Sequence, residues 1–408
     1  MQKQLVLLAS AFTYRAQAFE AAARKLGIPV VRGEDVPPPM LDKANVRLPI
    51  DYRDVPRSAA LIEAYAQEHP VGAIVGLDDS GTLIAAAACE RLGLPHNAPE
   101  AALAARDKHI MRRKFAQAGV PSPRFRHFTF SDDPEIIADE VSYPCVIKPT
   151  VLSGSRGVMR VDHPLEFLHR WLQLKRIVEN EGCDEFLVED YVPGVEVALE
   201  GLLHDGALHP LALFDKPDPL DGPYFEETIY VTPSRLPAGV QEEIVRTAQQ
   251  AAAALGLRQG PVHAELRVHQ GQPVMIEMAA RSIGGKCSKA LRFEAGASLE
   301  ELILRQAFGL PPAESGLPAA SGVMMIPIPE SGILAGVEGL EAAMNVPLIE
   351  EIEITAPLHR PILALPEGNS YLGFIFARGE APEAVENALR KAHARLEIEI
   401  LPQLALHL

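Results

Sequence analysis

The segment GPVHAELRVHQGQPVMIEMAARSIGG (residues 260–285) contains two runs in which polar and apolar residues alternate on either side of a turn at Gly271. An alternation of period two is typical of β-strands, so the two runs are predicted to pair as an antiparallel hairpin. Pairing about Gly271 places Glu265 opposite Glu277 on one face. The other face is predicted to be fully apolar and consists of Ala264, Leu266, Val268, Val274, Ile276 and Met278.

The polar face of this hairpin is a candidate metal site. Two carboxylates that face each other across a strand pair repel one another unless a cation lies between them. Oxygen ligands without clustered histidines and cysteines favour a hard ion, Mg²⁺ before Zn²⁺. Glu265 and Glu277 are therefore candidate metal ligands, with His263 and Arg267 on the same face. Two alternatives remain open here: both glutamates are solvated at the surface, or one of them pairs with Arg267.

A second candidate site is the segment VIKPTVLSGSRGV (146–158), in which a lysine on a predicted strand precedes a loop of small residues. Glycines let backbone N–H groups approach a phosphate closely, serines add donors, and Lys148 and Arg156 supply positive charge. The P-loop pattern GxxxxGK[ST] is absent from the sequence. An ordinary hairpin connection remains an alternative. The candidate phosphate-binding residues of the loop are Ser153, Gly154, Ser155 and Gly157.

The order of the predicted elements indicates a fold of class α/β and α+β. Strands alternate with helices over residues 1–95, which predicts an open parallel sheet. From about residue 124 short alternating runs predict a more antiparallel region that lasts to about residue 310, and residues 309–322 have the composition of a linker. The predicted elements are strands at 4–9, 28–31, 72–76, 144–149, 185–190 and 195–203 and helices at 14–26, 56–68, 80–92, 107–118 and 382–397.

The composition excludes several classes of partner. The 408 residues contain 38 Lys and Arg against 54 Asp and Glu, a formal charge of −16, which would repel nucleic acid and anionic lipid. The sequence has no run of 18 apolar residues that would predict a membrane span. Its four cysteines are widely spaced, which favours a reducing, cytoplasmic location over a disulfide framework.

The ordered set of these motifs resembles the ATP-grasp superfamily over roughly residues 1–310. Within it the chain is most similar to the L-amino-acid ligases of the biotin-carboxylase-like branch. Further stretches that carry this likeness are 213–235, the pattern Glu277–Arg281–Gly284, and 371–389. The resemblance implies an N-terminal α/β domain at 1–105 and a two-lobed nucleotide-binding domain at 106–310, with its lid at about 124–193. It also implies a C-terminal α+β segment at 311–408.

The resemblance also implies a role for each matching residue. The phosphates of ATP would contact Lys108 and Lys148 under the 153–157 loop. One or two Mg²⁺ ions, or Mn²⁺, would be held by the two facing glutamates. Many relatives carry Asn two residues after the second of these, where this chain has Ala279, which puts the second ion in doubt. The remaining implied contacts are Glu189 and the backbone of Tyr191 and Val192 with adenine, Glu196 with ribose, Arg281 with the charged intermediate, and the loop at Gly284 with the substrate carboxylate.

The implied activity is an ATP-dependent carboxylate–amine ligase that forms an amide bond through an acyl phosphate and releases ADP and phosphate. Amino acids are the expected substrates, and a homodimer is considered as the assembly. One alternative is a bicarbonate-using carboxylase of biotin-carboxylase type, and another is a nucleotide-binding protein without catalysis. Candidate residues for the acceptor pocket, where an ordinary loop is the alternative, are Lys216, Glu226, Glu227 and Tyr230.

Overall fold

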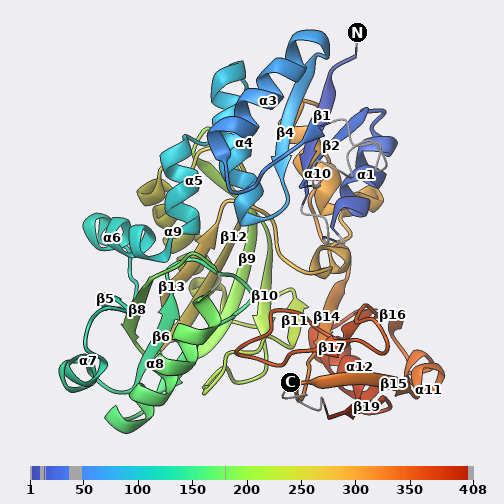
Figure 1. Cartoon of the computed structure of the whole chain (residues 1–408). Helices are drawn as coiled ribbons and strands as arrows, with labels where there is room; N and C mark the ends of the chain where they lie inside the picture. The colour runs from blue at the N-terminus through green and yellow to red at the C-terminus, as the bar shows by residue number, and fades with distance from the viewer. Residues whose placement is uncertain (1, 10–12, 14, 36–47, 180, 403–408) are drawn as a thin grey trace.

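The N-terminal part of the chain is a parallel four-stranded sheet in the order β3-β2-β1-β4 (Figure 1). The computed structural model describes residues 2–9, 13, 15–35, 48–179 and 181–402. Leu5 to Leu8 are all fully buried because the sheet is covered on both faces, by α1 and α10 on one and by α3 and α4 on the other. The elements are β1 (Gln4–Leu8), α1 (Ala16–Lys25), β2 (Val30–Glu34), β3 (Leu48–Pro49), α3 (Val55–Glu68), β4 (Val71–Gly76), α4 (Asp79–Leu92) and α10 (Leu299–Ala307).

An eight-stranded antiparallel sheet forms the centre of the molecule, in the order β13-β12-β9-β10-β11-β14-β18-β16. Its last three strands come from the C-terminal part of the chain, so one sheet connects the central and C-terminal segments. The predicted linker is therefore too long, because a strand already begins at Ala320. The strands are β9 (Val195–His204), β10 (Ala207–Lys216), β11 (Ile229–Thr232), β12 (Gly260–His269), β13 (Gln272–Ala279), β14 (Ala320–Ile326), β16 (Ile349–Ile354) and β18 (Gly373–Gly379).

Three helices cover one face of the central sheet: α5 (Pro99–Arg106), α6 (Lys108–Ala118) and α9 (Ala238–Leu255). The start of α6 is fixed by Asp107, whose side chain accepts a hydrogen bond from the backbone N–H of Ile110 at 2.9 Å. Its end is fixed by Gly119, which adopts a left-handed conformation with φ +70°. This cap places Lys108 in the first helical turn, where its side chain is buried.

A separate four-stranded sheet, in the order β5-β8-β6-β7, carries two helices and is called the lid lobe below. Its core includes Trp171, the single tryptophan of the chain, which is 7% exposed and packs near Phe130. The elements are β5 (Phe125–Thr129), α7 (Pro134–Glu140), β6 (Cys145–Pro149), β7 (Met159–Val161), α8 (Pro164–Val178) and β8 (Glu185–Asp190).

The C-terminal segment adds a small sheet in the order β17-β15-β19, which shares a core with β14 and β18. The predicted last helix is too long, because it ends at His393 and Glu397 already begins a strand. The boundaries predicted at 105/106 and 310/311 stay predictions. The remaining elements are η2 (Cys287–Ala290), η3 (Glu294–Gly296), β15 (Gly332–Glu338), α11 (Leu340–Met344), β17 (Pro361–Ile362), α12 (Pro382–His393) and β19 (Glu397–Leu401).

The hairpin predicted within residues 260–285 is present, with one correction. Glu265 pairs with Glu277 as predicted, but the register shifts directly after this pair and Leu266 lies opposite Met275. Such a bulge leaves one extra residue on β13 and reverses the faces of the residues on one side of it. Met275 is therefore fully buried, whereas Val274 and Ile276, which were predicted for the buried face, are only half-buried.

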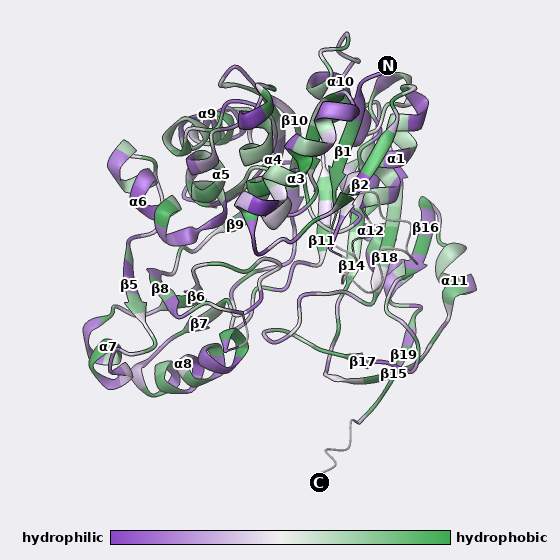
Figure 2. Ribbon diagram, turned by 45° about the horizontal axis from the view of Figure 1, so that its top comes forward, coloured by the Kyte–Doolittle hydropathy of each residue, from purple (hydrophilic) through white to green (hydrophobic). Residues whose placement is uncertain are grey.

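Hydropathy follows this architecture. Figure 2 shows hydrophobic residues along β1 and the central strands, whereas the outer helices alternate between hydrophilic and hydrophobic stretches. Such an alternation is expected of helices that bury one side on a sheet. Among the helices that the structure describes, none is long and apolar enough to cross a bilayer.

Candidate functional site

A cleft lies between the lid lobe and the central sheet, and it brings together most of the residues singled out in the sequence. The lid lobe contributes β6, β8 and the loop after β6, the central sheet contributes β9, β12 and β13, and α6 contributes its first turn. The predicted residues that line the cleft are Lys108, Lys148, Ser153, Gly154, Ser155, Glu189, Tyr191, Val192, Glu196, Glu227, Glu265, Glu277 and Arg281.

A buried triad of charges lies on the lid side of the cleft, and two of its members, Lys148 and Glu189, line the cleft. Glu189 Oε2 lies 2.5 Å from Lys148 Nζ, and Glu189 Oε1 lies 2.8 Å from Arg112 Nε. Burial alone would raise the Glu189 pKa, but the two cations hold it below its usual range. Burial lowers the pKa of Lys148 to about 8, although Glu189 opposes this. Glu189 thus has two ion-pair partners, instead of the adenine contact alone that the resemblance implies.

Lys108 connects the loop after β6 with the hairpin. Its Nζ donates to the carbonyl oxygen of Leu152 at 2.8 Å and to Glu277 Oε1 at 3.2 Å. The Lys108 side chain is 5% exposed. A cation this well buried and this close to the small-residue loop is suited to an anionic ligand. Glu277 is consequently paired with a lysine and not with its strand partner Glu265.

The loop after β6 carries the predicted small residues. Ser153 and Gly154 are exposed at its tip, and Gly154 has φ +65°. Gly157 is not among the cleft residues: it has φ +75°, donates its N–H to the Pro366 carbonyl at 3.0 Å and would place a Cβ 2.9 Å from Leu174. Gly157 therefore holds the loop through its bond to Pro366 and does not itself line the cleft.

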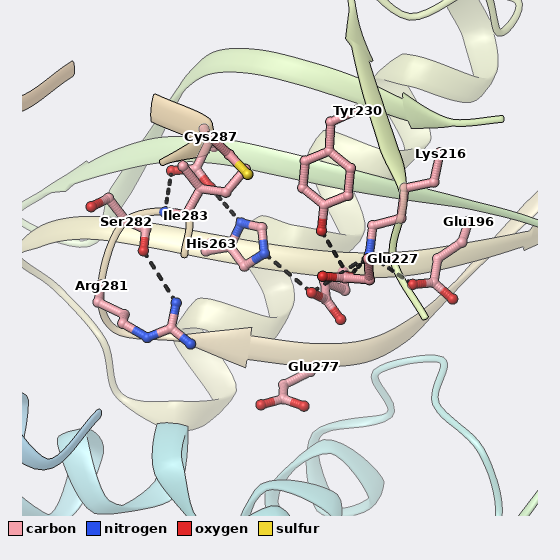
Figure 3. A network of polar contacts seen from close by, with 12 residues as sticks. Glu196, Lys216, Glu227, Tyr230, His263, Glu277, Arg281, Ser282, Ile283 and Cys287 are labelled. Carbon is pink, nitrogen blue, oxygen red and sulfur yellow. Dashed lines mark hydrogen bonds and ion pairs between the residues drawn. The ribbon is translucent and has the colours of Figure 1, made fainter. Parts of the chain in front are cut away.

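A cluster of three carboxylates surrounds one buried lysine at the other end of the cleft (Figure 3). Lys216 Nζ lies 2.8 Å from Glu196 Oε1, contacts Glu227 and lies 3.6 Å from Glu265 Oε1. Burial would lower the Lys216 pKa, but the three carboxylates hold it well above its usual value. Oxygen atoms of the three glutamates lie within 4.8 Å of one another, a spacing that could hold a cation. Tyr230 donates its hydroxyl to Glu227 at 2.7 Å.

His263 links this cluster to the interior of the sheet. Its Nδ1 contacts Glu200, which also accepts the Ile283 N–H at 3.1 Å, and its Nε2 lies 3.2 Å from Glu265 Oε1. Burial opposes protonation, yet the carboxylates raise the His263 pKa to about 9. For Glu265, burial would raise the pKa, but Lys216 and His263 hold it well below its usual range. Glu265 is therefore a charged carboxylate between two cations.

Arg281 lies on the side of the cleft next to the N-terminal domain, and Asp79 of that domain holds its side chain. Its Nε donates to Asp79 Oδ1 at 2.8 Å and its Nη2 to Asp79 Oδ2 at 3.3 Å. Burial opposes the charge, but Asp79 keeps the Arg281 pKa above its usual value. Arg15 donates to the side chain and carbonyl of the neighbouring Ser282. Two residues of the N-terminal domain thus orient the segment that carries this arginine.

Four other predicted residues lie outside the cleft lining. Lys216 and Tyr230 do not line the cleft themselves. They donate hydrogen bonds to Glu196 and Glu227, which do line it. Gly284 accepts the Cys287 N–H in the turn before η2. Glu226 is half-buried in the loop before β11, and burial raises its pKa.

Several residues that shape the site were not predicted from the sequence. Asp79 follows the carboxyl end of β4, a position where parallel sheets commonly bind ligands, and this signal could have identified it. His263 was placed on the correct face of the hairpin without a role, and Arg267 was considered only as a partner of one of the facing glutamates; both line the cleft, and Arg267 lies 3.8 Å from Glu196. Arg112 lies one helical turn after Lys108, and no sequence signal distinguishes it from a surface arginine.

Comparisons with known proteins match this architecture. Family models match residues 19–96 as an ATP-grasp N-terminal domain, 141–290 as an ATP-grasp domain and 324–400 as an L-amino acid ligase C-terminal domain 2. The crystal structure of an L-amino acid ligase from Bacillus licheniformis superposes with a TM-score of 0.83 at 25% identity, covering 99% of both chains. Residues 19–96 and 141–290 thus match ATP-grasp domains, which confirms the ATP-grasp resemblance predicted from the motif order.

Two curated relatives are amino-acid ligases by name. Alanine–anticapsin ligase of Bacillus subtilis is 30% identical over 54% of this chain and 50% of its own length. Carnosine synthase 1 of Gallus gallus is 28% identical over 67% of this chain and 32% of its own length. The chain thus spans about half the length, or less, of these relatives. The predicted fold class, with an N-terminal parallel α/β part and an ATP-grasp domain, is confirmed.

Proposed function

We propose that this chain is an ATP-dependent carboxylate–amine ligase that joins amino acids through an acyl phosphate and releases ADP and phosphate. One observation carries the proposal: two buried lysines, Lys108 and Lys148, an acidic cluster and a fixed Arg281 line a single cleft. The ATP-grasp domain and the L-amino acid ligase C-terminal domain support this class of reaction. The activities of the relatives alanine–anticapsin ligase and carnosine synthase 1 support amino acids as substrates.

The proposal includes ATP as a substrate and Mg²⁺ (or Mn²⁺) as the resident cation. The donor chemistry suits a hard cation, because three carboxylates present oxygen atoms within 4.8 Å of one another, and an ion bound there would share them with the Lys216 ammonium. Such an ion neutralises charge on the phosphates. Glu265 serves as a ligand whether its partners are Glu196 and Glu227 or its strand neighbour Glu277. In the latter case the ion pair of Glu277 with Lys108 has to open.

The proposed reaction uses the chain's own charges at two steps. The oxygen of a substrate carboxylate attacks the γ-phosphorus of ATP, ADP leaves, and an amine then attacks the acyl carbon and displaces phosphate. Both steps concentrate negative charge, which fixed cations in a water-poor cleft stabilise without reorganisation. Arg281 is suited to this because Asp79 holds its guanidinium in place.

We assign some residues of the cleft to ATP and others to the amino-acid substrates. Lys108 and Lys148 bind the phosphates beneath the 153–157 loop. Glu189 orients Lys148 through their ion pair, and this is compatible with an additional adenine contact. The other proposed contacts are the backbone of Tyr191 and Val192 with adenine, Glu196 with ribose, the loop at Gly284 with the substrate carboxylate, and Lys216, Glu226, Glu227 and Tyr230 at the acceptor pocket.

The decisive experiment is a phosphate-release screen over pairs of amino acids with ATP and Mg²⁺, with mass spectrometry of coupled products. The expected result is a dipeptide-like product that Arg281→Gln abolishes while ATP binding is largely retained. Arg292→Gln is the matched control, because the Arg292 side chain is 58% exposed and pairs with Glu350 at the surface. Incorporation of labelled bicarbonate without coupled product would favour a carboxylase, and ATP binding without any phosphate release would favour a non-catalytic binder.

A further inference from the structure

We propose that His109, His127 and Glu185 form a second metal site, for a borderline ion such as Zn²⁺, at the junction between α6 and the lid lobe. Their ligand atoms lie within 4.8 Å of one another, and all three side chains are half-buried. His127 Nε2 is already 3.1 Å from Glu185 Oε2. The site is separate from the carboxylate cluster of the cleft.

The chemistry of the three donors differs from that of the cleft. Two imidazoles and one carboxylate with a further position open to water are the ligand set of many zinc sites, whereas Mg²⁺ prefers oxygen ligands throughout. Within the described part of the chain, His109 makes ring contacts with His127 and Phe125 but no hydrogen bond or ion pair through its nitrogens. Its lone pair is therefore available to a ligand.

The geometry requires one adjustment. The rings of His109 and His127 are stacked, with centroids 3.8 Å apart and planes inclined by 15°. Ring nitrogens bind metals in the plane of the ring, so two nearly parallel rings cannot point at one ion. A tetrahedral zinc ion with bonds of about 2.0–2.1 Å needs donors about 3.4 Å apart. Metal binding therefore requires the His109 ring to turn out of the stack and the donor atoms to approach one another by on the order of 1 Å.

The three proposed ligands lie on two parts of the molecule that border the cleft. His109 lies on α6, which packs against the central sheet with α9, while His127 and Glu185 lie on β5 and β8 of the lid lobe. An ion bound by all three ties the lid lobe to α6. His109 also follows Lys108 in the sequence, so the ion would hold the helical turn that carries a cleft lysine.

Titration of the purified chain with Co²⁺ tests the proposal, because four-coordinate cobalt with nitrogen ligands absorbs visible light. We expect one strongly absorbing Co²⁺ per chain, displaced by Zn²⁺, with binding at least 10-fold weaker in His109→Gln and His127→Gln. His169→Gln in the lid lobe and Glu265→Gln in the cleft should leave the absorption unchanged. No absorbing complex in the wild type, or one that survives both histidine substitutions, overturns the site.

A second measurement tests the tie between the lid lobe and α6 and does not depend on activity. Zn²⁺ is expected to raise the urea midpoint of Trp171 fluorescence in the wild type and not in His109→Gln, because an ion that binds only the folded state stabilises it. Circular dichroism establishes that each variant is folded. An equal response of the two proteins overturns the tie, even where cobalt binding is found.

Discussion

Replacing Glu189 with glutamine is predicted to destabilise the lid lobe strongly. The side chains of Arg112, Glu189 and Lys148 are 0%, 3% and 5% exposed, so the substitution leaves two buried cations without their shared anion. Breaking a buried ion pair in this way costs about 3–5 kcal/mol. With a urea dependence of about 1.5 kcal/mol/M for a unit of this size, the midpoint of unfolding should fall by about 2–3 M.

The assay uses the position of the single tryptophan. Trp171 belongs to the core of the lid lobe, so its fluorescence during urea unfolding reports on that lobe. The matched control is Asp190→Asn, at the adjacent position, because Asp190 pairs with an Arg124 side chain that is 87% exposed. An exposed pair contributes at most about 1 kcal/mol, so the control midpoint should shift by less than about 0.7 M. A Glu189→Gln midpoint as close to the wild type as the control would refute the reasoning.

Other substitutions address catalysis, pH dependence and backbone geometry. Asp79→Asn should lower kcat of phosphate release about 10–100-fold at nearly unchanged KM for ATP, because a charge-assisted hydrogen bond worth about 1.5–3 kcal/mol no longer orients Arg281. The His263 pKa is raised to about 9, so the protonated imidazole stabilises the folded state below pH 6.5, and this contribution is lost as pH rises through 9. His263→Gln should remove this part of the pH dependence of urea unfolding. Gly157→Ala should lower the Trp171 unfolding midpoint more than Gly182→Ala, because both have positive φ but only Gly157 has a leucine side chain 2.9 Å from the added Cβ.

Three outcomes would contradict these expectations. An unchanged kcat in Asp79→Asn would mean that Arg281 keeps its orientation without the carboxylate. A pH profile of unfolding that is identical in His263→Gln would assign the dependence to other groups. Equal midpoints for the two glycine variants would show that the loop after β6 yields to the extra methyl group.

The sequence predicted those parts of the site that depend on local periodicity. The alternation around Gly271 placed Glu265 opposite Glu277, and the helix predicted at 107–118 placed Lys108 at a helix start. The bulge after Glu265 could not be predicted, because both registers bury a comparable number of apolar residues.

The ion-pair partners depend on how the domains pack, and periodicity contains no information on that. Glu277 pairs with a lysine from α6, and Glu189 with an arginine from the same helix. Asp79 reaches Arg281 across 202 positions of the chain. In each pair the two residues lie on different elements, so only the tertiary arrangement determines which charges meet.

The shared central sheet has a consequence for how this protein can be divided. β11 (Ile229–Thr232) is buried at every position and bonds to β10 on one side and to β14 on the other. Removing the C-terminal segment would expose the backbone of β11 as a bare strand edge, a template for aggregation. Tyr230, which supports the acidic cluster, lies on that strand. The protein therefore should not be cut between the ATP-grasp domain and the C-terminal domain, since β14, β16 and β18 complete the sheet on which the cleft is built.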